Sequence, residues 1–365
     1  MKTISQIAAF APSQSATAEY HILLSVTDPS LPYAAQLEEI LHAYIQSTKG
    51  KMVHFRRFFL SDAANQAPSL TEALRSLPSV PTSVVQQAPL DGTRIAMWVY
   101  CTSGMDCPGG VPTHGGYSHH WTGSLVSPGK DSYEQMGGIF RALEGELGKV
   151  GLSVASDTVR TWIFVRDVDA NYGGVVVGRR EYFNTIGLTP STHFIASTGI
   201  EGRNPDFRNI VEMDAYSVGG LEDGQKRYLY ALDHLSPTAD YGVTFERGTC
   251  IQYGDRSHIF ISGTASIDSK GQVLYPGDVS SQTGRLLENV EALLREADAG
   301  LEDIAMAIVY LREAADYSIV RKVIEGTCPS LHALYVLGPV CRPAWLVEME
   351  CLALTPSGNP SFRAF

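Results

Sequence analysis

The stretch from His258 to Ile267, HIFISGTASI, decides the fold, because apolar and polar residues alternate in it as they do in a half-buried β-strand. A turn rich in Gly and Asp follows, and Asp278 then occupies the position of a helix N-cap. Leucines and valines recur behind Asp278 with helical spacing, until Ala299 and Gly300 end the pattern. This part of the chain therefore predicts a strand followed by an amphipathic helix.

The segments that follow complete a unit in the order strand, helix, strand, helix, strand, strand. They are expected at 303–311, 315–326, 332–337 and 345–354. The same order is expected earlier in the chain, at 121–125, 132–147, 158–165, 171–186, 192–198 and 210–217. A fainter version is expected at 20–26, 34–47, 52–59, 70–76, 83–87 and 94–101. VRTWIFVRDVDANY from Val159 aligns with AMAIVYLREAADY from Ala305, so a threefold repeat is the economical interpretation.

Two glycine-rich connectors, 103–117 and 219–240, interrupt all periodicity and mark the boundaries between units. They predict units at 1–105, 116–220 and 241–365. Each unit would place one layer of helices on one sheet, and three units could cover one another's open sheet faces. We therefore expect an α+β fold of tandem βαβαββ units, packed as a pseudo-trimer within one chain, with clefts at the three seams where small ligands bind.

The amino-acid composition indicates which kinds of partner and which cellular compartment fit this protein. The 365 residues include 28 Lys and Arg against 39 Asp and Glu, a formal net charge of −11 without any dense basic run, which disfavours nucleic acid as a partner. No stretch approaches the ~20 consecutive apolar residues of a membrane span, and the first residues lack a secretory apolar core. The six cysteines are scattered, so we expect reduced thiols and a cytoplasmic protein without membrane contact.

A cluster of potential zinc ligands occurs between the first two units: Cys101, Cys107, His114, His119 and His120. Their spacing matches no compact metal site, and locally hydrogen-bonded histidines are the simpler interpretation. No phosphate-binding glycine loop occurs either. We therefore predict neither a metal nor a cofactor.

Residues 243–354 resemble the Rid (YjgF) superfamily, through ISGTASI at Ile261, PGDVSSQT at Pro276, the strand DIAMAIVYL and the ending LVEME at Leu346. Members of that superfamily are typically homotrimers with ligand sites between subunits, so the resemblance implies that three fused units reproduce the trimer. Ordinary members hydrolyse imines and enamines and hold the substrate carboxylate with an arginine at the start of the penultimate strand. The corresponding positions read PSLH at 329–332, PST at 190–192 and PTS at 81–83, without an arginine, which weakens this activity.

A narrower resemblance is to the chorismatases, Rid-like enzymes that remove pyruvate from chorismate. It is carried by YGVTFERGT at Tyr241, CRPAWLVEME at Cys341, RREYF at Arg179 and STGIEG at Ser197. The resemblance implies that Glu348 donates a proton to the enolpyruvyl methylene.

Two further positions bear on the product of such a reaction. A cysteine at Cys341 and a glycine at Gly248 are similar to those of the branch that forms 3-hydroxybenzoate. Chorismatases usually carry two histidines after the GTASI strand, whereas this chain has DSKGQVLY at 268–275. Another enol-ether carboxylate is therefore an alternative substrate.

The residue types agree with an acid that protonates a vinyl carbon. Glu348 alternates with Glu350, so both point to one face of a strand, and a semi-apolar site would raise the pKa of such a carboxyl. The alternative is that both glutamates face solvent. Arg342 beside Cys341 would favour a thiolate for nucleophilic or addition chemistry, although a lone cysteine near a strand is more often a small buried hydrophobe.

Planar cations that bind carboxylates are the remaining candidates. Guanidinium groups grip a dicarboxylate bidentately, and surface ion pairs are the alternative role. The predicted substrate-binding residues are Arg160, Arg179, Arg247, Gly248 and Arg342, with Gly248 leaving room for a ligand ring.

The leading functional hypothesis is thus a chorismatase-like enzyme of the lyase or hydrolase type, a 3-hydroxybenzoate synthase, with Glu348 and Cys341 as catalytic residues. Its site would lie at the seam between the second and third units and take a small-molecule carboxylate. We expect a monomer or a weak homo-oligomer. The alternatives are Rid-type imine or enamine hydrolysis and a non-catalytic protein that binds a small molecule at the same seam.

Overall fold

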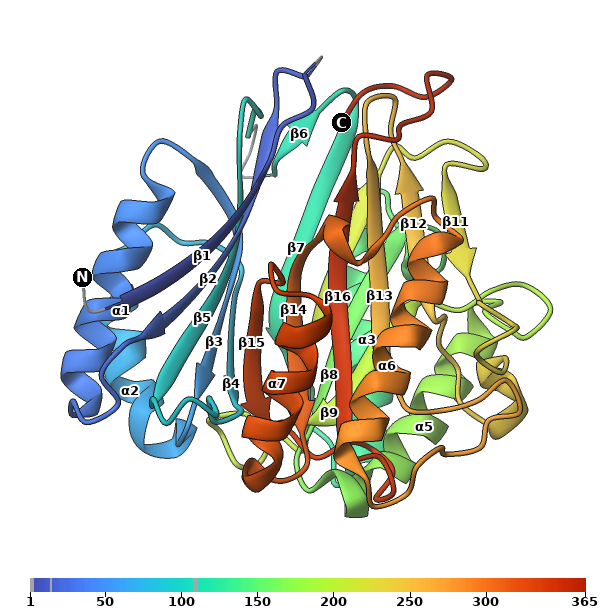
Figure 1. Ribbon diagram of the computed structural model, residues 1–365. Helices are drawn as coiled ribbons and strands as arrows, with labels where there is room; N and C mark the ends of the chain where they lie inside the picture. The colour runs from blue at the N-terminus through green and yellow to red at the C-terminus, as the bar shows by residue number, and fades with distance from the viewer. Residues whose placement is uncertain (1–2, 14, 108–110) are drawn as a thin grey trace.

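The computed structural model describes residues 3–13, 15–107 and 111–365, and it contains three β-sheets with helices packed on their outer faces (Figure 1). Residues 108–110 of the connector at 103–117 lie outside the described part of the chain.

The first sheet has the strand order β1-β2-β5-β3-β4. Its strands are β1 (Thr3–Phe10), β2 (Ala18–Val26), β3 (Met52–Leu60), β4 (Thr82–Gln86) and β5 (Ile95–Ser103). Helices α1 (Tyr33–Thr48) and α2 (Ala63–Leu74) cover its outer face (Figure 1).

The second sheet has the order β6-β7-β10-β8-β9. Its strands are β6 (Thr113–His114), β7 (Tyr117–Leu125), β8 (Thr158–Val165), β9 (Ala196–Glu201) and β10 (Val211–Gly219). Its helices are α3 (Ser132–Gly148), the single turn α4 (Val154–Asp157) and α5 (Val168–Thr185).

The third sheet has the order β11-β12-β13-β16-β14-β15. Its strands are β11 (Lys226–Leu229), β12 (Gly248–Gln252), β13 (Ser257–Ala265), β14 (Ile304–Leu311), β15 (Ala333–Leu337) and β16 (Val347–Thr355). Its helices are α6 (Val279–Arg295) and α7 (Tyr317–Thr327), and 3₁₀ turns lie at Thr238–Tyr241, Leu301–Asp303 and Ala314–Asp316.

The three sheets share one topology, which confirms the α+β repeat. In each sheet the last strand of the unit, β5, β10 or β16, lies between two antiparallel neighbours. The pairs β3–β4, β8–β9 and β14–β15 are parallel and end each sheet on the same side. The helix expected behind Asp278 forms as α6, with Asp278 as its N-cap accepting from the Ser281 amide at 3.0 Å.

The βαβαββ order is incomplete, because every sheet also contains short or half-exposed strands at its edge. These are β1, β6 and β11, and β11 lies inside the connector that was expected to be irregular. A further strand outside the predicted order, β12, is buried between β11 and β13. Edge strands bury little of either face, so they lack the apolar alternation that identifies the inner strands. Three predicted starts are also wrong: α2 begins at Ala63 rather than Leu70 and continues through Pro68, β7 begins at Tyr117 rather than Trp121, and β9 begins at Ala196 rather than Thr192.

The inner faces of the three sheets meet in an aromatic core. Trp98, Trp121 and Trp162 of the first two sheets lie with ring centroids 5.9–6.1 Å apart. The third sheet joins them through Phe260, whose ring lies 5.6 Å from that of Tyr216, which in turn stacks on Trp121 at 4.3 Å. Rings of this size bury large apolar areas, so the core holds the units together as a pseudo-trimer. Because β11 pairs with β12, we propose that the third unit begins near Lys226 rather than at 241. For the other two units we propose the boundaries expected from the sequence, 1–105 and 116–220.

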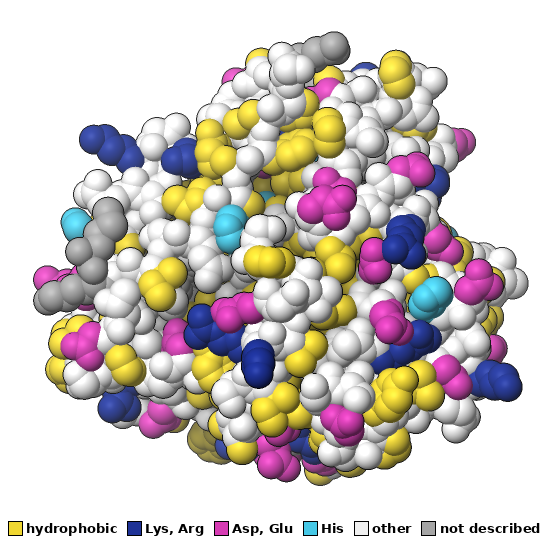
Figure 2. Space-filling model, in the orientation of Figure 1, with side chains coloured by type: hydrophobic (Ala, Val, Ile, Leu, Met, Phe, Trp, Pro, Cys, Tyr) yellow, Lys and Arg dark blue, Asp and Glu magenta, His cyan; other side chains and the backbone are white. Residues whose placement is uncertain are grey.

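The outer surface agrees with the charge balance of the sequence. On the face drawn in Figure 2, Lys and Arg side chains are interspersed with Asp and Glu side chains. Within the described residues, no helix has both the length and the apolar character needed to cross a bilayer.

Candidate active site

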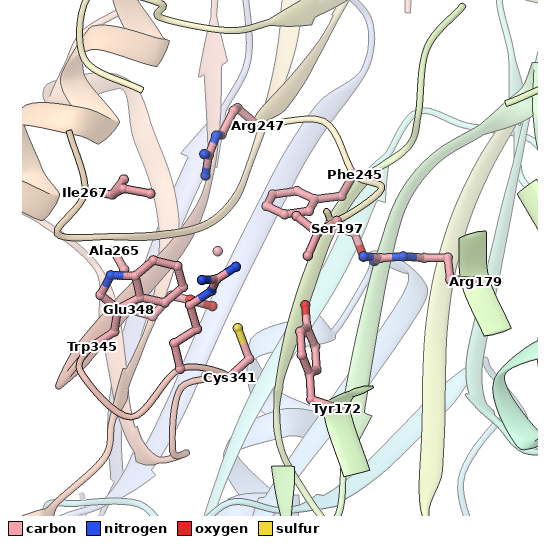
Figure 3. Close-up of a pocket in the computed structure, with 14 residues that line it drawn as sticks. Tyr172, Arg179, Ser197, Phe245, Arg247, Ala265, Ile267, Cys341, Trp345 and Glu348 are labelled. Carbon is pink, nitrogen blue, oxygen red and sulfur yellow. The ribbon is translucent and has the colours of Figure 1, made fainter. Parts of the chain in front are cut away.

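A pocket lies at the seam between the second and third sheets. It encloses about 500 Å³, part of it open to solvent. Tyr172 and Arg179 reach in from α5 on one side, and Cys341 and Glu348 lie on the other (Figure 3). Its lining residues are Tyr172, Arg179, Ser197, Gly199, Val243, Phe245, Arg247, Gly263, Ala265, Ile267, Cys341, Arg342, Trp345 and Glu348. Polar groups that converge within a partly apolar lining are typical of a small-ligand site.

Glu348 is the acid of this pocket. It lies near the start of β16, opposite Ala265 of β13 and Tyr310 of β14, and it is only 5% exposed. Burial, and after it the neighbouring charge of Glu350, raise its pKa to about 8 against the opposing effect of Arg160 and Arg247. The predicted solvent-facing alternative is therefore wrong, and Glu348 is a protonated carboxylic acid at neutral pH.

Gly263 makes the room that Glu348 occupies. The ladder between β13 and β16 shifts register between Ile261 and Thr264, which places Gly263 against the carboxyl group. A Cβ built on Gly263 would lie 2.8 Å from Cδ of Glu348, closer than van der Waals contact allows. The sequence indicated this close approach, since an isolated glycine within a strand pattern, such as Gly263, often marks a place where another group comes close to the backbone.

Three of the predicted arginines line the pocket. Arg179 of α5 is buried and donates through Nε to Thr244 Oγ1 at 3.1 Å. Arg247 donates through Nη2 to the Ser236 carbonyl at 3.0 Å, and its guanidinium lies 5.5 Å from the centre of the Phe245 ring. Arg342 lies 5.4 Å from the centre of the Trp345 ring. Cationic groups held by protein atoms and aromatic faces are suited to bind carboxylates.

Cys341 lies in the pocket, and its surroundings favour the neutral buried thiol over the thiolate, the two alternatives considered from the sequence. Burial, and after it the nearby Glu348 carboxyl, raise the pKa of its thiol to about 12. A hydrogen bond with Tyr172 and the charges of Arg342 and Arg179 lower it by less. Arg342 therefore does not generate a thiolate, and Cys341 is a neutral thiol bonded to the Tyr172 hydroxyl.

Two predicted substrate-binding residues are absent from the lining. Arg160 is buried behind the pocket, where its Nη2 contacts Glu350 Oε2 at 2.8 Å. Gly248 begins β12, and a Cβ there would meet Leu229 Cδ1 at 3.1 Å and Ile261 Cδ1 at 3.2 Å. Its lack of a side chain thus makes room for neighbouring strands, whereas Gly263 makes room in the pocket.

Several lining residues were not identified from the sequence: Tyr172, Ser197, Gly199, Val243, Phe245, Gly263, Ala265, Ile267 and Trp345. Tyr172 had a signal, since it aligns with Tyr317 in the two matching segments. Gly199 lies against it, because a Cβ there would be 2.8 Å from Tyr172 Cε2. The other lining residues occupy a pocket only because two sheets meet, which one unit's pattern does not reveal.

Two of the three histidines considered as zinc ligands, His119 and His120, have hydrogen-bond partners within the second sheet. His119 Nδ1 lies 2.7 Å from the Tyr216 hydroxyl, and His120 Nε2 lies 3.0 Å from Ser118 Oγ. Among the residues that the structure describes, no group of three or more His, Cys, Asp or Glu side chains is placed to hold a metal ion.

Comparison with known proteins locates the chain within a family. The model for Endoribonuclease L-PSP matches residues 251–355. A RutC family protein of Pyrococcus abyssi is 37% identical over 97 residues, which is 26% of this chain and 76% of that protein. The 3-aminoacrylate deaminase RutC of Acinetobacter baylyi is 31% identical over 97 residues, 26% of this chain and 77% of the deaminase.

A crystal structure of a chorismatase is similar over the whole fold. It has a TM-score of 0.65 at 19% sequence identity and covers 93% of this chain and 100% of the chorismatase. At that identity the likeness concerns the fold alone. The RutC relatives, whose own length is covered to more than two thirds, lead to one conclusion: the chain belongs to the Rid (YjgF) superfamily.

Proposed function

We propose that this protein is a chorismatase-like enzyme that protonates the enol ether of a dicarboxylic substrate and releases pyruvate. The observation that carries the proposal is Glu348, a buried carboxylic acid whose pKa is raised to about 8, in a pocket that three arginines also line. The fold shared with a chorismatase supports it, without assigning the substrate.

The first chemical step needs a proton on the terminal vinyl carbon. A carboxyl group with an ordinary pKa is ionised at neutral pH and cannot supply that proton, whereas Glu348 still holds it. Protonation leaves a cation on the carbon that bears the ether oxygen, and the ionised Glu348 stabilises it. The electron pair of the bond between the ether oxygen and the ring then stays on that oxygen, which completes pyruvate and leaves the positive charge on the ring. Loss of a ring proton, which returns to Glu348, gives the aromatic hydroxybenzoate and restores the acid.

The arginines suit a substrate with two carboxylates. Arg179 enters from α5, while Arg247 and Arg342 belong to the third sheet's side of the seam. Carboxylates held from both sides would fix the vinyl carbon in one position relative to Glu348. Chorismate carries a ring carboxylate and an enolpyruvyl carboxylate, which matches this arrangement of charge.

Formation of 3-hydroxybenzoate would need no net water, since that product and pyruvate together contain all the atoms of chorismate. The pocket agrees with a route that limits hydrolysis, because Phe245, Trp345 and Ile267 contribute an apolar lining. Cys341 would take part as a neutral thiol bonded to Tyr172. Residues 268–275, which lack the family's histidines, form an exposed turn behind Ile267, so a related enol-ether carboxylate remains the alternative substrate.

The test is to incubate the purified protein with chorismate and to measure pyruvate and 3-hydroxybenzoate by chromatography. Glu348→Gln should abolish both products while leaving the fold intact by circular dichroism. Absence of turnover, in an assay where a known chorismatase is active, would exclude chorismate as the substrate.

Imine hydrolysis is the second candidate, and the 31% identity to a 3-aminoacrylate deaminase is the observation that favours it. The pocket arginines offer a carboxylate partner even though the usual strand-start arginine is missing. Faster ammonia release from 3-aminoacrylate, generated enzymatically, would support this activity. Binding of either substrate that survives Glu348→Gln, without turnover by either protein, would instead indicate a non-catalytic binding protein.

A further inference from the structure

A second carboxyl group lies directly behind the pocket. Glu350 is 2% exposed and follows Glu348 by two residues on β16, so the two side chains project from the same face of the strand, ~7 Å apart along it. Glu350 is absent from the pocket lining. Burying a carboxyl group that does not line the pocket costs a large desolvation free energy. Other groups must therefore interact with Glu350 and compensate for this cost.

Four elements converge on Glu350. Arg160 of β8 contacts it at 2.8 Å, and the Tyr310 hydroxyl of β14 donates to it at 3.0 Å. The Thr198 hydroxyl of β9 donates a short hydrogen bond, and Arg57 Nη1 of β3 lies 3.8 Å away. Arg57 comes from the first sheet, which contributes no residue to the pocket lining.

These partners are those of an anion. Two guanidinium groups and two hydroxyl donors surround the carboxyl oxygens, and buried arginines in turn require a negative partner. Arg57 is fully buried and divides its contacts between Glu350 and Asp214, whose Oδ2 lies 2.7 Å from its Nη2. Glu350 therefore places a fixed negative charge behind Glu348.

The other titratable groups facing Glu348 act more weakly or in the opposite direction. Arg160 and Arg247 favour its ionised form. The Cys341 thiol and the Tyr172 hydroxyl are neutral, because burial raises the pKa of each. The charge of Glu350 is the largest influence on the Glu348 proton after burial itself.

We propose that Glu350 is a positioning residue of this site: its fixed negative charge keeps the proton on Glu348, and Arg57, Arg160 and Tyr310 hold that charge in place. The importance of this coupling for turnover rests on the proposed function, but the coupling itself does not. Through Arg57, the first sheet takes part in a site that it does not line.

The second sheet contains a counterpart of this pair of acids. VEMD at 211–214 of β10 matches VEME at 347–350 of β16, and burial and the charge of Asp214 raise the pKa of Glu212 to about 8. There, however, Ser124 and Asn204 donate hydrogen bonds to Glu212. A pair of acids of the same kind thus recurs in the second sheet, where hydrogen-bond donors of the protein contact Glu212 directly.

The experiment is an infrared titration of the protonated carboxyl band of Glu348, which needs no substrate. It is performed in a Glu212→Gln background, because Glu212 would titrate in the same pH range, and Glu348→Gln identifies the band. Glu350→Gln removes the repelling charge and so favours ionisation of Glu348. We expect the midpoint to fall by about one to two pH units, the scale of one unit charge at ~7 Å. Tyr310→Phe removes a hydrogen bond without a charge and should shift the midpoint by less than half as much.

Arg160→Gln tests the same coupling with the opposite sign and covers the case in which Glu350→Gln does not fold. Losing the cation leaves the charge of Glu350 less balanced, so the midpoint of Glu348 should rise. An unchanged or higher midpoint in Glu350→Gln, or an unchanged or lower one in Arg160→Gln, would overturn the proposal. If the protein turns over chorismate, the alkaline limb of its kcat/KM profile should shift in each variant together with the infrared midpoint of Glu348. If it does not, the proposed function is wrong, and the infrared midpoints alone test the role of Glu350.

Discussion

At the scale of single residues, the proton on Glu348 depends on where the side chain is buried. The folded protein binds this proton up to a pH of about 8, whereas an exposed glutamate releases it near its usual pKa of about 4.5. As a proton donor Glu348 works below its folded pKa. We therefore expect the proposed activity to be lost as the pH rises through about 8, and a pH profile of kcat/KM measures this directly.

The raised pKa of Glu348 also lowers the free energy of unfolding of the protein at neutral pH. Because the folded state binds the proton more tightly than the unfolded state, the contribution of Glu348 becomes increasingly unfavourable as the pH rises from about 4.5 to about 8. Glu348→Gln removes this term, so we expect it to increase the free energy of unfolding at pH 7 by about 1–3 kcal/mol. Urea denaturation at pH 5 and pH 7 provides the test, since the gain should be smaller at pH 5. An equal gain at both pH values would contradict the assigned pKa.

Gly263 offers a second prediction at this scale. Gly263→Ala would push a methyl group into the Glu348 carboxyl, so we expect kcat with the true substrate to fall about 100-fold through misplacement of the acid. Gly284→Ala is the matched control, because a Cβ at this position in α6 meets no atom within 4 Å. That control should retain full activity and gain about 0.5–1 kcal/mol of stability. Equal losses in both variants would show that Gly263 has no special role.

At the scale of secondary structure, each unit contains one buried glutamine as the fourth residue of its first helix. Gln36, Gln135 and Gln282 occupy this place in α1, α3 and α6. Gln282 donates to the Tyr275 and Ala344 carbonyls and accepts from the Leu346 amide, all within 3.1 Å. It thereby holds the loop that carries Cys341, Arg342 and Trp345. Gln135 makes the corresponding bonds with Arg208 and with the amides of Ile210 and Val211.

This pair provides a matched test of the loop. Gln282→Leu and Gln135→Leu each break buried hydrogen bonds and should each lower the free energy of unfolding by about 2–3 kcal/mol. Only Gln282→Leu should reduce kcat/KM, because only its loop lines the pocket. Similar kinetic losses in both variants would mean that activity follows global stability instead.

At the scale of the whole molecule, one buried arginine connects the three sheets. Arg57 of the first sheet pairs with Asp214 of the second and approaches Glu350 of the third, and its guanidinium lies 5.0–5.5 Å from the centres of four aromatic rings. In an ordinary trimer such contacts would cross between subunits, whereas here they lie within one chain. The central ion pairs are thus part of what holds the pseudo-trimer together.

Arg57→Met should accordingly lower the free energy of unfolding by about 3–5 kcal/mol, because it leaves Asp214 buried without its cation and removes one of the two cations beside Glu350. Adding Asp214→Asn should restore part of this loss. Urea denaturation of both single variants and the double variant gives the coupling energy as a double-mutant cycle. Strictly additive effects would show that the two side chains do not interact.

The sequence alone determined the repeat and the inner elements of each unit. Strands such as β8 and β13 are recognisable from short apolar runs or from the alternation of apolar and polar residues every two positions. Helix α6 is recognisable because its leucines recur with the helical period. Glu348, Arg179, Arg247, Arg342 and Cys341 were predicted from a family resemblance in the residues around them, and all five line the pocket. The edge strands were missed, since their residues face solvent on too many sides to show a period.

Only the tertiary structure decided the chemistry of these residues. Whether Cys341 is a thiolate, whether Arg160 faces a ligand or Glu350, and whether Gly248 or Gly263 makes room all depend on which surfaces meet at the seam. Periodicity reports the face on which a side chain lies, but not the charges that another sheet brings against it. The physical reason is that desolvation and Coulomb interactions are set by distances across the seam, between residues more than a hundred positions apart in the chain, as for Arg160 and Glu350.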